Sequence, residues 1–299
     1  MQKIERIGFI GLGVMGEPMS ANLVSKAGIP VHVYDQNPQA VERLAAIGGV
    51  SEASAEELGS TVDIVFLSLP SITQVEVVCE ALLRARRIPK LIVDMSTSDV
   101  ARTRALAHRL AQDGVKLVDA PVARTKEAAI QGTLFITVGA TQELFETVRP
   151  LLSHMGSDVL HCGDTGCGQI VKILNNIMVF MTVNALSEVL TMGRRAGMDG
   201  KELFDALSKG SADSFALRNH GMKSLVPDTF PEKTFPVEYA IKDAALALAL
   251  ADAAGFKPHI ARYTFDLLCQ TKAAGFVQHY HPALIQLVDG RVQVKGLEP

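Results

Sequence analysis

The first half of the chain alternates short apolar runs with amphipathic segments at regular spacing. The runs are almost continuously apolar, which is typical of strands buried on both faces of a parallel sheet. The predicted strands are Ile7–Ile10, Val31–Tyr34, Ile64–Leu69, Leu91–Met95, Leu117–Val118 and Phe135–Val138. Helical patterns lie between them, for example at Val41–Ile47 and Val100–Leu110. The pattern therefore predicts an α/β domain whose ligands bind beyond the carboxyl ends of the strands.

The second half of the chain has helical patterns only. From Ile173 to Ser187 there is no charged residue and almost no polar stripe, so we expect a helix buried on all sides. Three more helices follow, with glycines at their ends that are suited to terminate them. These helices are Lys201–Leu207, Ala240–Ala254 and Ala261–Ala273, and the glycines are Gly197, Gly255 and Gly275. The segment Val226–Pro236 contains three prolines and is predicted to be an extended connection.

Length and pattern together divide the chain of 299 residues into three parts. We predict an α/β domain over residues 1–163, a long connecting helix over residues 164–196 and an all-helical domain over residues 197–299. The change from mixed to purely helical periodicity places the junction at the glycine-rich segment 163–168.

Composition excludes several classes of protein. The net charge is −3, with 29 basic and 32 acidic residues, so there is no footprint for nucleic acid or for an anionic membrane. The four cysteines lack the paired spacing of a metal site, and we expect free thiols. The N-terminus runs directly into a strand pattern, and the uncharged run is too short and too rich in Asn and Thr for a membrane span. We expect a cytoplasmic protein without a metal.

A glycine-rich sequence follows the first predicted strand. Gly11, Gly13 and Gly16 form the pattern G-x-G-x-x-G, which allows a tight turn and a close approach of a pyrophosphate to the start of a helix. Asp35 ends the next strand, where a carboxylate can bind a ribose diol and repel a 2′-phosphate. We therefore predict NAD rather than NADP, although Asp35 could simply end a strand. The other loop residues predicted to bind the cofactor are Leu12, Val14 and Met15.

Three further loops lie at predicted carboxyl ends of strands. They begin at Leu69-Pro70, at Ser96-Thr97 and at Asp119, and the last continues through Ala123, Arg124 and Thr125. The general position of ligands in such sheets makes these loops candidates for the cleft. For Pro70 and Ser96, ordinary turn residues are an equally good interpretation.

Lys172 and Asn176 stand at the start of the long uncharged helix. With Gly168 they are spaced by four residues, which places the three on one helix face. A lysine drawn out of water loses its proton more readily, so Lys172 is a candidate proton donor. Alternatively, Lys172 extends to solvent from a frayed helix end. Lys242 lies on an alanine- and leucine-rich helix, where it could pair with Glu238 on a solvated face.

Seven segments occur in an order that resembles the β-hydroxyacid dehydrogenase family. They are IGFIGLGVMGEPMSANL, VYDQNP, FLSLP, DMST, DAPV with a later GTL, GQIVKILNN and IKDAALAL, and they span nearly the whole chain. The resemblance implies a Rossmann-like N-terminal domain, a long interdomain helix and an all-α C-terminal domain. It also implies NAD(P)-dependent interconversion of a hydroxy acid with its aldehyde or keto form, and a dimer or tetramer.

The same resemblance assigns roles to individual residues. The catalytic lysine of the family corresponds to Lys172, the substrate-holding asparagine to Asn176, and a lysine near the nicotinamide to Lys242. From their positions at the ends of strands, we expect Leu69, Pro70 and Thr97 to bind the cofactor, and Ser96 to bind the substrate on the nicotinamide side.

The chain departs from the family pattern at two places. Most members read D-x-P-V-S-G-G, whereas this chain has Ala123, Arg124 and Thr125 in place of the serine and two glycines. This variant resembles sulfolactaldehyde reductase, and we expect Arg124 to bind a sulfonate or a distal carboxylate. Alternatively, Arg124 turns toward a cofactor phosphate or solvent. Near the end, Val277 and Tyr280 replace a glycine and an aspartate, which leaves the shape of the substrate open.

Two other functions compete with a dehydrogenase of small anionic substrates. An NAD(H)-sensing or chromatin-reader module would keep the cofactor site, but the pair Lys172 and Asn176 and the lack of an appended basic segment argue against it. An imine reductase would replace the catalytic lysine. Within the family, 3-hydroxyisobutyrate, 4-hydroxybutyrate and tartronate semialdehyde chemistry are the alternatives to sulfolactaldehyde reduction.

Overall fold

A computed structural model of the chain describes residues 4–232 and 234–293. The chain divides into two compact units, and the boundary falls directly after Lys172. We describe each unit by itself.

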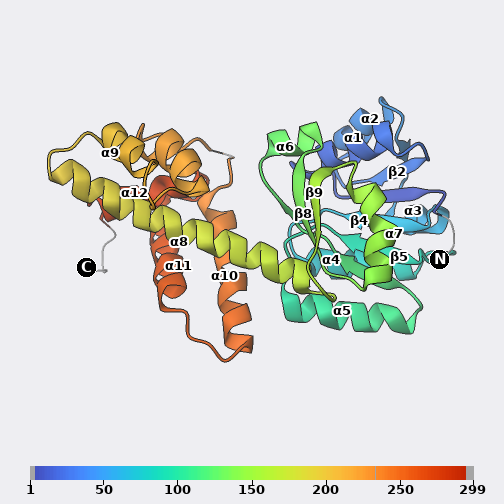
Figure 1. The fold of residues 1–299 in the computed structure, drawn as a ribbon. Helices are drawn as coiled ribbons and strands as arrows, with labels where there is room; N and C mark the ends of the chain where they lie inside the picture. Colours follow the sequence, from blue (N-terminus) through green and yellow to red (C-terminus); the bar gives the residue numbers. More distant parts are fainter. Residues whose placement is uncertain (1–3, 233, 294–299) are drawn as a thin grey trace. The chain divides into compact units, whose positions relative to one another are not determined.

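A six-stranded parallel sheet forms the centre of the first unit, with strand order β3-β2-β1-β4-β5-β6 (Figure 1). The strands are β1 (Ile7–Ile10), β2 (Val31–Tyr34), β3 (Val50–Ser51), β4 (Ile64–Leu67), β5 (Leu91–Asp94) and β6 (Lys116–Asp119). Ile10, Tyr34, Leu67, Asp94 and Asp119 lie at one level because the strands pair in register. The strand order reverses between β1 and β4, which is where such sheets bind ligands.

Successive residues along the strands contribute alternately to two apolar layers, one on each face of the sheet. Phe9 and Phe66 belong to one layer, whereas Ile10, Val65 and Leu67 belong to the other. The prediction of a parallel sheet covered on both faces is therefore confirmed for these strands. The helices of this region are α1 (Gly16–Lys26), α2 (Pro38–Ala45), α3 (Ala55–Thr61), α4 (Ile72–Leu83) and α5 (Val100–Gln112). Side chains cap four of their N-termini as good capping residues do, namely Asn37, Ser54, Ser71 and Asp99.

The run Phe135–Val138 does not join the parallel sheet as expected. It lies in β8 (Leu134–Val138), the middle strand of a second sheet, between β7 (Val122–Ala123) and β9 (Gly156–His161). Only two residues separate β6 from β7, too few for a parallel crossover, and β7 pairs antiparallel with β8. β9 is polar and half-exposed, so it gave no apolar run in the sequence. The helices of this part are α6 (Lys126–Gln131) and α7 (Gln142–Leu152).

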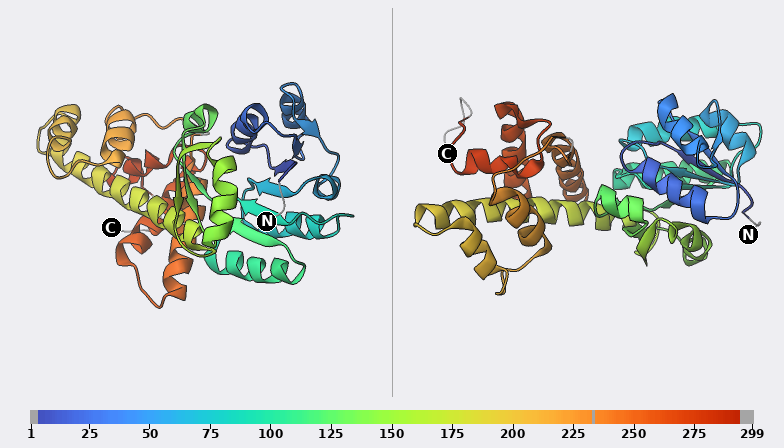
Figure 2. Two further views of the ribbon diagram at one scale, coloured as in Figure 1. Left: turned by 45° about the vertical axis from the view of Figure 1, so that its right-hand side comes forward. Right: turned by 90° about the horizontal axis from the view of Figure 1, so that it is seen from above.

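The second unit is helical, as predicted (Figures 1 and 2). Its helices are α8 (Cys167–Arg195, whose first residues belong to the first unit), α9 (Gly200–Leu207), η1 (Leu217–Leu225), α10 (Val237–Ala253), α11 (His259–Thr271), η2 (Lys272–Phe276), η3 (His281–Leu284) and α12 (Ile285–Val288). α10 and α11 pack against each other as an antiparallel pair. Gly197, Gly255 and Gly275 all have positive φ, which confirms them as helix ends.

The expectation that the uncharged helix is buried on all sides is wrong. One stripe of α8 is open, with Leu174 50%, Met178 61% and Met192 61% exposed. Leu174 and Met192 are 18 residues apart, which is about five turns, so the stripe runs straight along the helix. The opposite face packs into the helical unit through residues such as Phe180. α8 is long and apolar enough to cross a membrane, but 44% of its most apolar window is buried, which is also typical of a core helix in a soluble protein.

Candidate functional site

The three loop glycines have different surroundings, and the differences match the needs of a dinucleotide. Gly11 has φ of 95°, and a Cβ there would lie 2.2 Å from the Ser68 carbonyl oxygen. A Cβ on Gly16 would lie 1.8 Å from the Gly11 carbonyl oxygen, so both are glycines because of the protein's own packing. A Cβ on Gly13 would have no neighbour within 4 Å. Gly13 thus leaves an open backbone for a ligand, and the loop fits the pyrophosphate of NAD.

Asp35 joins the glycine loop to a hollow at the end of β2. Its Oδ2 accepts a hydrogen bond from the Leu12 amide at 2.6 Å, and its Oδ1 accepts one from the Asn37 amide at 2.7 Å. The adjoining hollow of about 340 Å³ is lined by Asp35, Glu42 and Glu52 but by no lysine or arginine of the described chain. Three carboxylates and no cation make this hollow suited to a ribose diol and unsuited to a 2′-phosphate.

Ser96 links the carboxyl ends of the neighbouring strands β4 and β5 by hydrogen bonds. Its Oγ accepts a hydrogen bond from the Leu69 amide at 2.9 Å, and its own amide donates to Asp94 Oδ1 at 2.9 Å. Gln169, at the start of α8, donates to the Ser96 carbonyl oxygen at 2.8 Å and accepts from the Ser98 amide at 2.9 Å. Leu69, Ser96 and α8 thus lie together at the carboxyl edge of the sheet, with Pro70 exposed and Thr97 half-buried beside them.

Asp119 anchors the start of α8. Its buried carboxylate accepts hydrogen bonds from the amides of Gly166 at 2.6 Å and Gln169 at 2.9 Å. Burial raises the pKa of Asp119 to about 6, although the amide donors oppose this rise. A Cβ on Gly168 would lie 2.4 Å from the Thr137 carbonyl oxygen, so only glycine allows this close packing. Lys172, one turn after Gly168, is half-buried and belongs to the same unit.

In the second unit, Asn176 is part of a buried polar group. Its Nδ2 donates to Asp243 Oδ2 at 2.7 Å, and its Oδ1 accepts from the Asn175 side chain at 3.1 Å. The ammonium of Lys242 lies 3.2 Å from Asp243 Oδ1. The carboxylate of Glu238 lies 3.9 Å from the Lys272 ammonium. The structure therefore brings Lys242 and Asn176 to one carboxylate, while Ser96, Arg124 and Lys172 belong to the first unit.

The guanidinium of Arg124 is occupied by acceptors of its own chain. It donates to the Thr133 carbonyl oxygen at 2.6 Å, to Ser157 Oγ at 2.9 Å and to Asp158 Oδ2 at 2.7 Å. Its φ is 85°, a conformation that favours glycine, so the backbone keeps a glycine-like turn while the side chain binds β9. Ala123 precedes this turn, and Thr125 follows it and caps α6. Within the described residues, no acceptor binds the backbone amides of Arg124 and Thr125.

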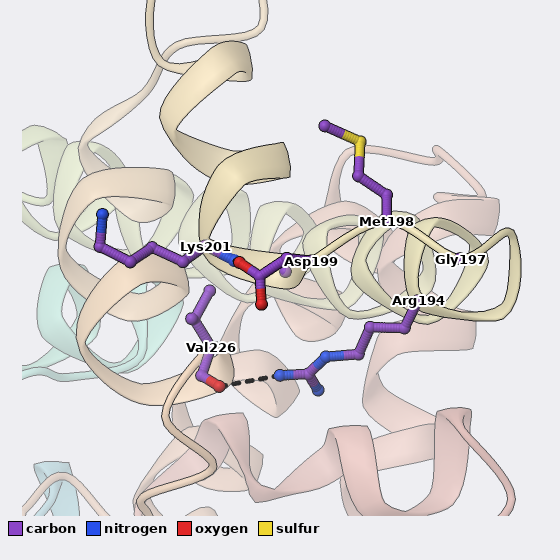
Figure 3. Close-up of a pocket in the computed structure, with 7 residues that line it drawn as sticks. Arg194, Gly197, Met198, Asp199, Lys201 and Val226 are labelled. Carbon is purple, nitrogen blue, oxygen red and sulfur yellow. Dashed lines mark hydrogen bonds between the residues drawn. The ribbon is translucent and has the colours of Figure 1, made fainter.

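The hollow in Figure 3 contains none of the predicted site residues. It has a volume of about 370 Å³ and lies around the start of α9. Arg194 donates to the Val226 carbonyl oxygen at 2.8 Å, Lys201 pairs with Asp205, and Asp199 accepts from the first amides of α9. Its charges are thus satisfied internally, and it is not a candidate for the anion site.

Three residues of this region were not singled out from the sequence. Asp119 was expected only as part of a cleft loop, and Gln169 and Asp243 were not predicted to take part. Gln169 is fully buried and Asp243 is 3% exposed. The available signal was an acid or amide inside an otherwise apolar helix, because such groups need partners when they are buried.

Comparison with known proteins agrees with this geometry. Residues 6–163 match the NAD-binding domain of 6-phosphogluconate dehydrogenase, and residues 166–288 match the NAD-binding domain of NADP-dependent 3-hydroxyisobutyrate dehydrogenase. The chain therefore belongs to the β-hydroxyacid dehydrogenase family, and it is an NAD-dependent oxidoreductase that acts on hydroxy acids.

Individual relatives show the chemistry of close members. The chain is 36% identical over 251 residues to 2-(hydroxymethyl)glutarate dehydrogenase of Eubacterium barkeri, covering 83% of each chain. It is 35% identical to 2-hydroxy-3-oxopropionate reductase of Escherichia coli K12, covering 95% of this chain and 97% of the relative. Among solved structures, 3-hydroxyisobutyrate dehydrogenase of Mycobacterium tuberculosis with L-serine matches with a TM-score of 0.87 at 29% identity, covering 96% of this chain and 99% of the other.

Proposed function

We propose that this chain is an NAD(H)-dependent reductase of a small semialdehyde that carries an anionic group, with Lys172 as the proton donor. One observation carries the proposal. Asp119 and Gln169 hold the start of α8 against the ends of β5 and β6, and Lys172 follows Gly168 by one turn of the same helix. We expect the cofactor to bind at this edge of the sheet. When bound, NADH supplies the hydride to the carbonyl carbon.

The residues of the chain supply the proton and the orientation. The Lys172 ammonium would hydrogen-bond the carbonyl oxygen, stabilise the negative charge that develops on it and donate the proton. Asn176, one turn later on α8, would bind the same oxygen, and Asp243 holds its amide in place. Lys242, paired with Asp243, would supply positive charge near the nicotinamide. In the first unit, Ser96 and Thr97 would line the nicotinamide side of the cofactor site.

The substrate anion would bind to backbone rather than to a guanidinium. No acceptor among the described residues binds the amides of Arg124 and Thr125, and the positive φ of Arg124 is a conformation that favours glycine, the residue that most members of the family have here. Successive backbone amides in such a turn form a concave donor site for an anion. We therefore favour a carboxylate semialdehyde. Sulfolactaldehyde is the second candidate, because the sequence of Ala123, Arg124 and Thr125 resembles that branch, and it would require Arg124 to leave Asp158.

The test is an NADH-oxidation assay with methylmalonate, tartronate and succinic semialdehydes and with sulfolactaldehyde, repeated with NADPH. We expect turnover of a carboxylate semialdehyde with NADH and a loss of about 10²-fold or more in Lys172→Ala, with NADH binding retained. Turnover of Lys172→Ala within a few-fold of the wild type would disprove the role of Lys172. A strong preference for sulfolactaldehyde would indicate that the Arg124 guanidinium binds the substrate anion.

We infer that the chain assembles as a homodimer through the open stripe of α8. Leu174 and Met178 are exposed on α8, and α11 exposes Ile260 (68%) and Tyr263 (58%). Large apolar side chains gathered on exposed helices are typical of subunit interfaces. Light scattering should give the mass of two chains, and Met178→Glu should shift it toward one. Val77→Glu, at a valine that is 60% exposed on α4, is the matched control and should leave the mass unchanged.

We place the protein in the cytoplasm. All four cysteines are free, which agrees with a reducing compartment. Fractionation of cells that produce the protein would test this assignment, and recovery with the membrane or secreted fraction would contradict it.

A further inference from the structure

One side chain at the start of α8 binds the backbone on both sides of Thr97. Gln169 is fully buried, and its Nε2 donates to the Ser96 carbonyl oxygen at 2.8 Å. Its Oε1 accepts a hydrogen bond from the Ser98 amide at 2.9 Å. The two bonded groups belong to the peptide units directly before and directly after Thr97. We call these two hydrogen bonds the Gln169 bridge.

The Gln169 bridge determines how Thr97 is oriented. A peptide unit is planar, so a hydrogen bond to its C=O or its N–H restrains the whole unit. The two units that flank Thr97 meet at its Cα, and their planes together set the direction in which its side chain leaves the backbone. A single amide therefore fixes the orientation of Thr97.

Thr97 is the residue of this loop that a ligand can reach. In the described range 91–98, every residue except Thr97 is buried, and Thr97 is half-buried. It lies beyond the carboxyl end of β5, which pairs with β4 and β6. Ligands of such sheets bind beyond the carboxyl ends of the strands. Thr97 can therefore transmit the orientation set by Gln169 to a bound cofactor.

The backbone that carries Gln169 is itself held in place. The Gln169 amide donates to Asp119 Oδ2 at 2.9 Å, and the Thr137 hydroxyl donates to the Gly168 carbonyl oxygen at 3.0 Å. A Cβ on Gly168 would lie 2.4 Å from the Thr137 carbonyl oxygen, so helix and strand are in close contact here. The first turn of α8 cannot shift relative to β6 and β8 without breaking these contacts.

The sheet holds the loop from the other side and explains why residue 169 is an amide. Asp94 accepts hydrogen bonds from the Ser96 amide at 2.9 Å and from Ser98 Oγ at 2.8 Å. Asp94 is 1% exposed and Asp119 is fully buried, so two carboxylates already lie in this region. Glutamine offers a donor and an acceptor without adding a third buried charge, whereas glutamate would offer acceptors only.

Lys172 starts from a neighbouring position on the same helix. It follows Gln169 by three residues on α8, and both residues belong to the first unit. Residues three apart are neighbours on a helix surface, with about 5–6 Å between their Cβ atoms. Gln169 therefore links the loop that carries Thr97 to the helical turn that carries Lys172.

We propose that Gln169 is a positioning residue for hydride transfer, which fixes the backbone on both sides of Thr97 so that Thr97 holds the nicotinamide ring in place for the reaction at Lys172. The proposal rests on the proposed function, because it takes Lys172 as the proton donor. We expect the glycine loop and Asp35 to bind the other half of the cofactor. Loss of the Gln169 bridge should therefore leave the cofactor bound while its nicotinamide ring becomes mobile.

The test observes the bound ring without turnover. The fluorescence lifetime of NADH lengthens when its nicotinamide ring is held, and a titration followed by the same fluorescence gives the Kd. Gln169→Met removes both hydrogen bonds at similar side-chain length. We expect its bound NADH to have a lifetime shortened toward that of free NADH, with a Kd within a few-fold of the wild type. The kcat with tartronate semialdehyde should fall about 10- to 100-fold, because small misplacements of reacting groups slow a reaction strongly.

Asn22→Leu is the matched control. Asn22 is another buried amide of the first unit, and its Nδ2 donates to the carbonyl oxygens of Ala129 at 2.8 Å and Ile130 at 3.2 Å. Urea unfolding should show a loss of stability in this variant, but its NADH lifetime and kcat should stay those of the wild type.

Gln169→Asn provides a second variant if Gln169→Met does not fold, because its amide is one carbon too short to bond both peptide units. If bound NADH keeps the wild-type lifetime in the Gln169 variants, Gln169 only stabilises the fold and the inference is overturned.

A double-mutant cycle tests whether Gln169 acts through Thr97. We expect Thr97→Ala to shorten the NADH lifetime in the wild type but to change it little further in Gln169→Met, because residues that act together are not additive. No effect of Thr97→Ala in the wild type, or the same effect in both backgrounds, would overturn the proposal. If the wild type binds NADH but reduces none of the semialdehydes, the proposed function fails, and the lifetimes still decide on Gln169.

Discussion

At position 124, we predict that the glycine variant of the protein is more stable than the alanine variant. A φ of 85° destabilises the folded state of a non-glycine residue by about 1–2 kcal/mol. Glycine removes this strain, but it also makes the unfolded chain more flexible, which lowers the free energy of unfolding by about 0.4–1 kcal/mol. Arg124→Gly should therefore be more stable than Arg124→Ala by about 0.5–1 kcal/mol.

Both variants lose the ion pair with Asp158, so that loss cancels in the comparison. The two side chains are 43% and 55% exposed, and an ion pair this open contributes little to stability because solvent screens it. Urea unfolding of the wild type, Arg124→Gly, Arg124→Ala and Asp158→Ala would give all the differences. Arg124→Ala as stable as Arg124→Gly would refute the reasoning about the backbone.

The same variants test how the anion binds. If backbone amides receive it, the KM of the carboxylate semialdehyde should stay within a few-fold of the wild type in Arg124→Gly. Asp158→Ala removes one of the three acceptors of the guanidinium without changing the residue at position 124, so it should also leave this KM nearly unchanged. A tenfold rise of KM in both Arg124 variants would show that the guanidinium binds the substrate.

Three more predictions concern the cofactor loop, the helical unit and the anchor of α8. Gly13→Ala should unfold like the wild type, because a Cβ there would have no neighbour within 4 Å. It should bind NADH at least tenfold more weakly, as judged by NADH fluorescence, because we expect the pyrophosphate to approach the backbone at this glycine. Asp243→Asn should lower kcat more than it changes KM, because it removes the charge that holds Asn176 and Lys242, and steady-state kinetics would show this. The pKa of Asp119 is about 6 in the folded protein, above its ordinary value, so its contribution to stability should fall as pH rises from about 4 to 6. The difference in unfolding free energy between the wild type and Asp119→Asn, followed across that range, measures this effect, and a constant difference would contradict it.

Much of the fold could be predicted because its signals are local. A run such as Ile64–Leu67 is short and apolar throughout, which is typical of a strand covered on both faces. The glycine loop and Asp35 were recognisable because backbone geometry requires specific residues at fixed spacing. Helix-ending glycines were equally visible, since positive φ favours glycine.

The rest could not be predicted because it depends on pairing across long stretches of chain. β9 is half-polar and becomes a strand only by pairing with β8. Whether Arg124 binds a ligand or Asp158 depends on a residue 34 positions away. Leu174, Met178 and Met192 in the open stripe of α8 are as apolar as the residues of its packed face, so hydropathy did not distinguish the two. Likewise, no local pattern in the sequence marks His281 as buried, and its ring contacts with Phe180 and His220 depend on residues far away in the chain.

The long helix α8 also matters during synthesis. Its partners in the second unit come much later in the chain, since Asn176 bonds Asp243 and Asn184 bonds Thr264, 67 and 80 residues downstream. At translation rates of about 5–20 residues per second, the uncharged segment waits about 4–16 s before its partner helices exist. During that time the growing chain presents an apolar helix to the ribosome surface and to chaperones. Slowing translation after residue 190 should therefore increase chaperone capture and aggregation, whereas slowing it after α11 should not.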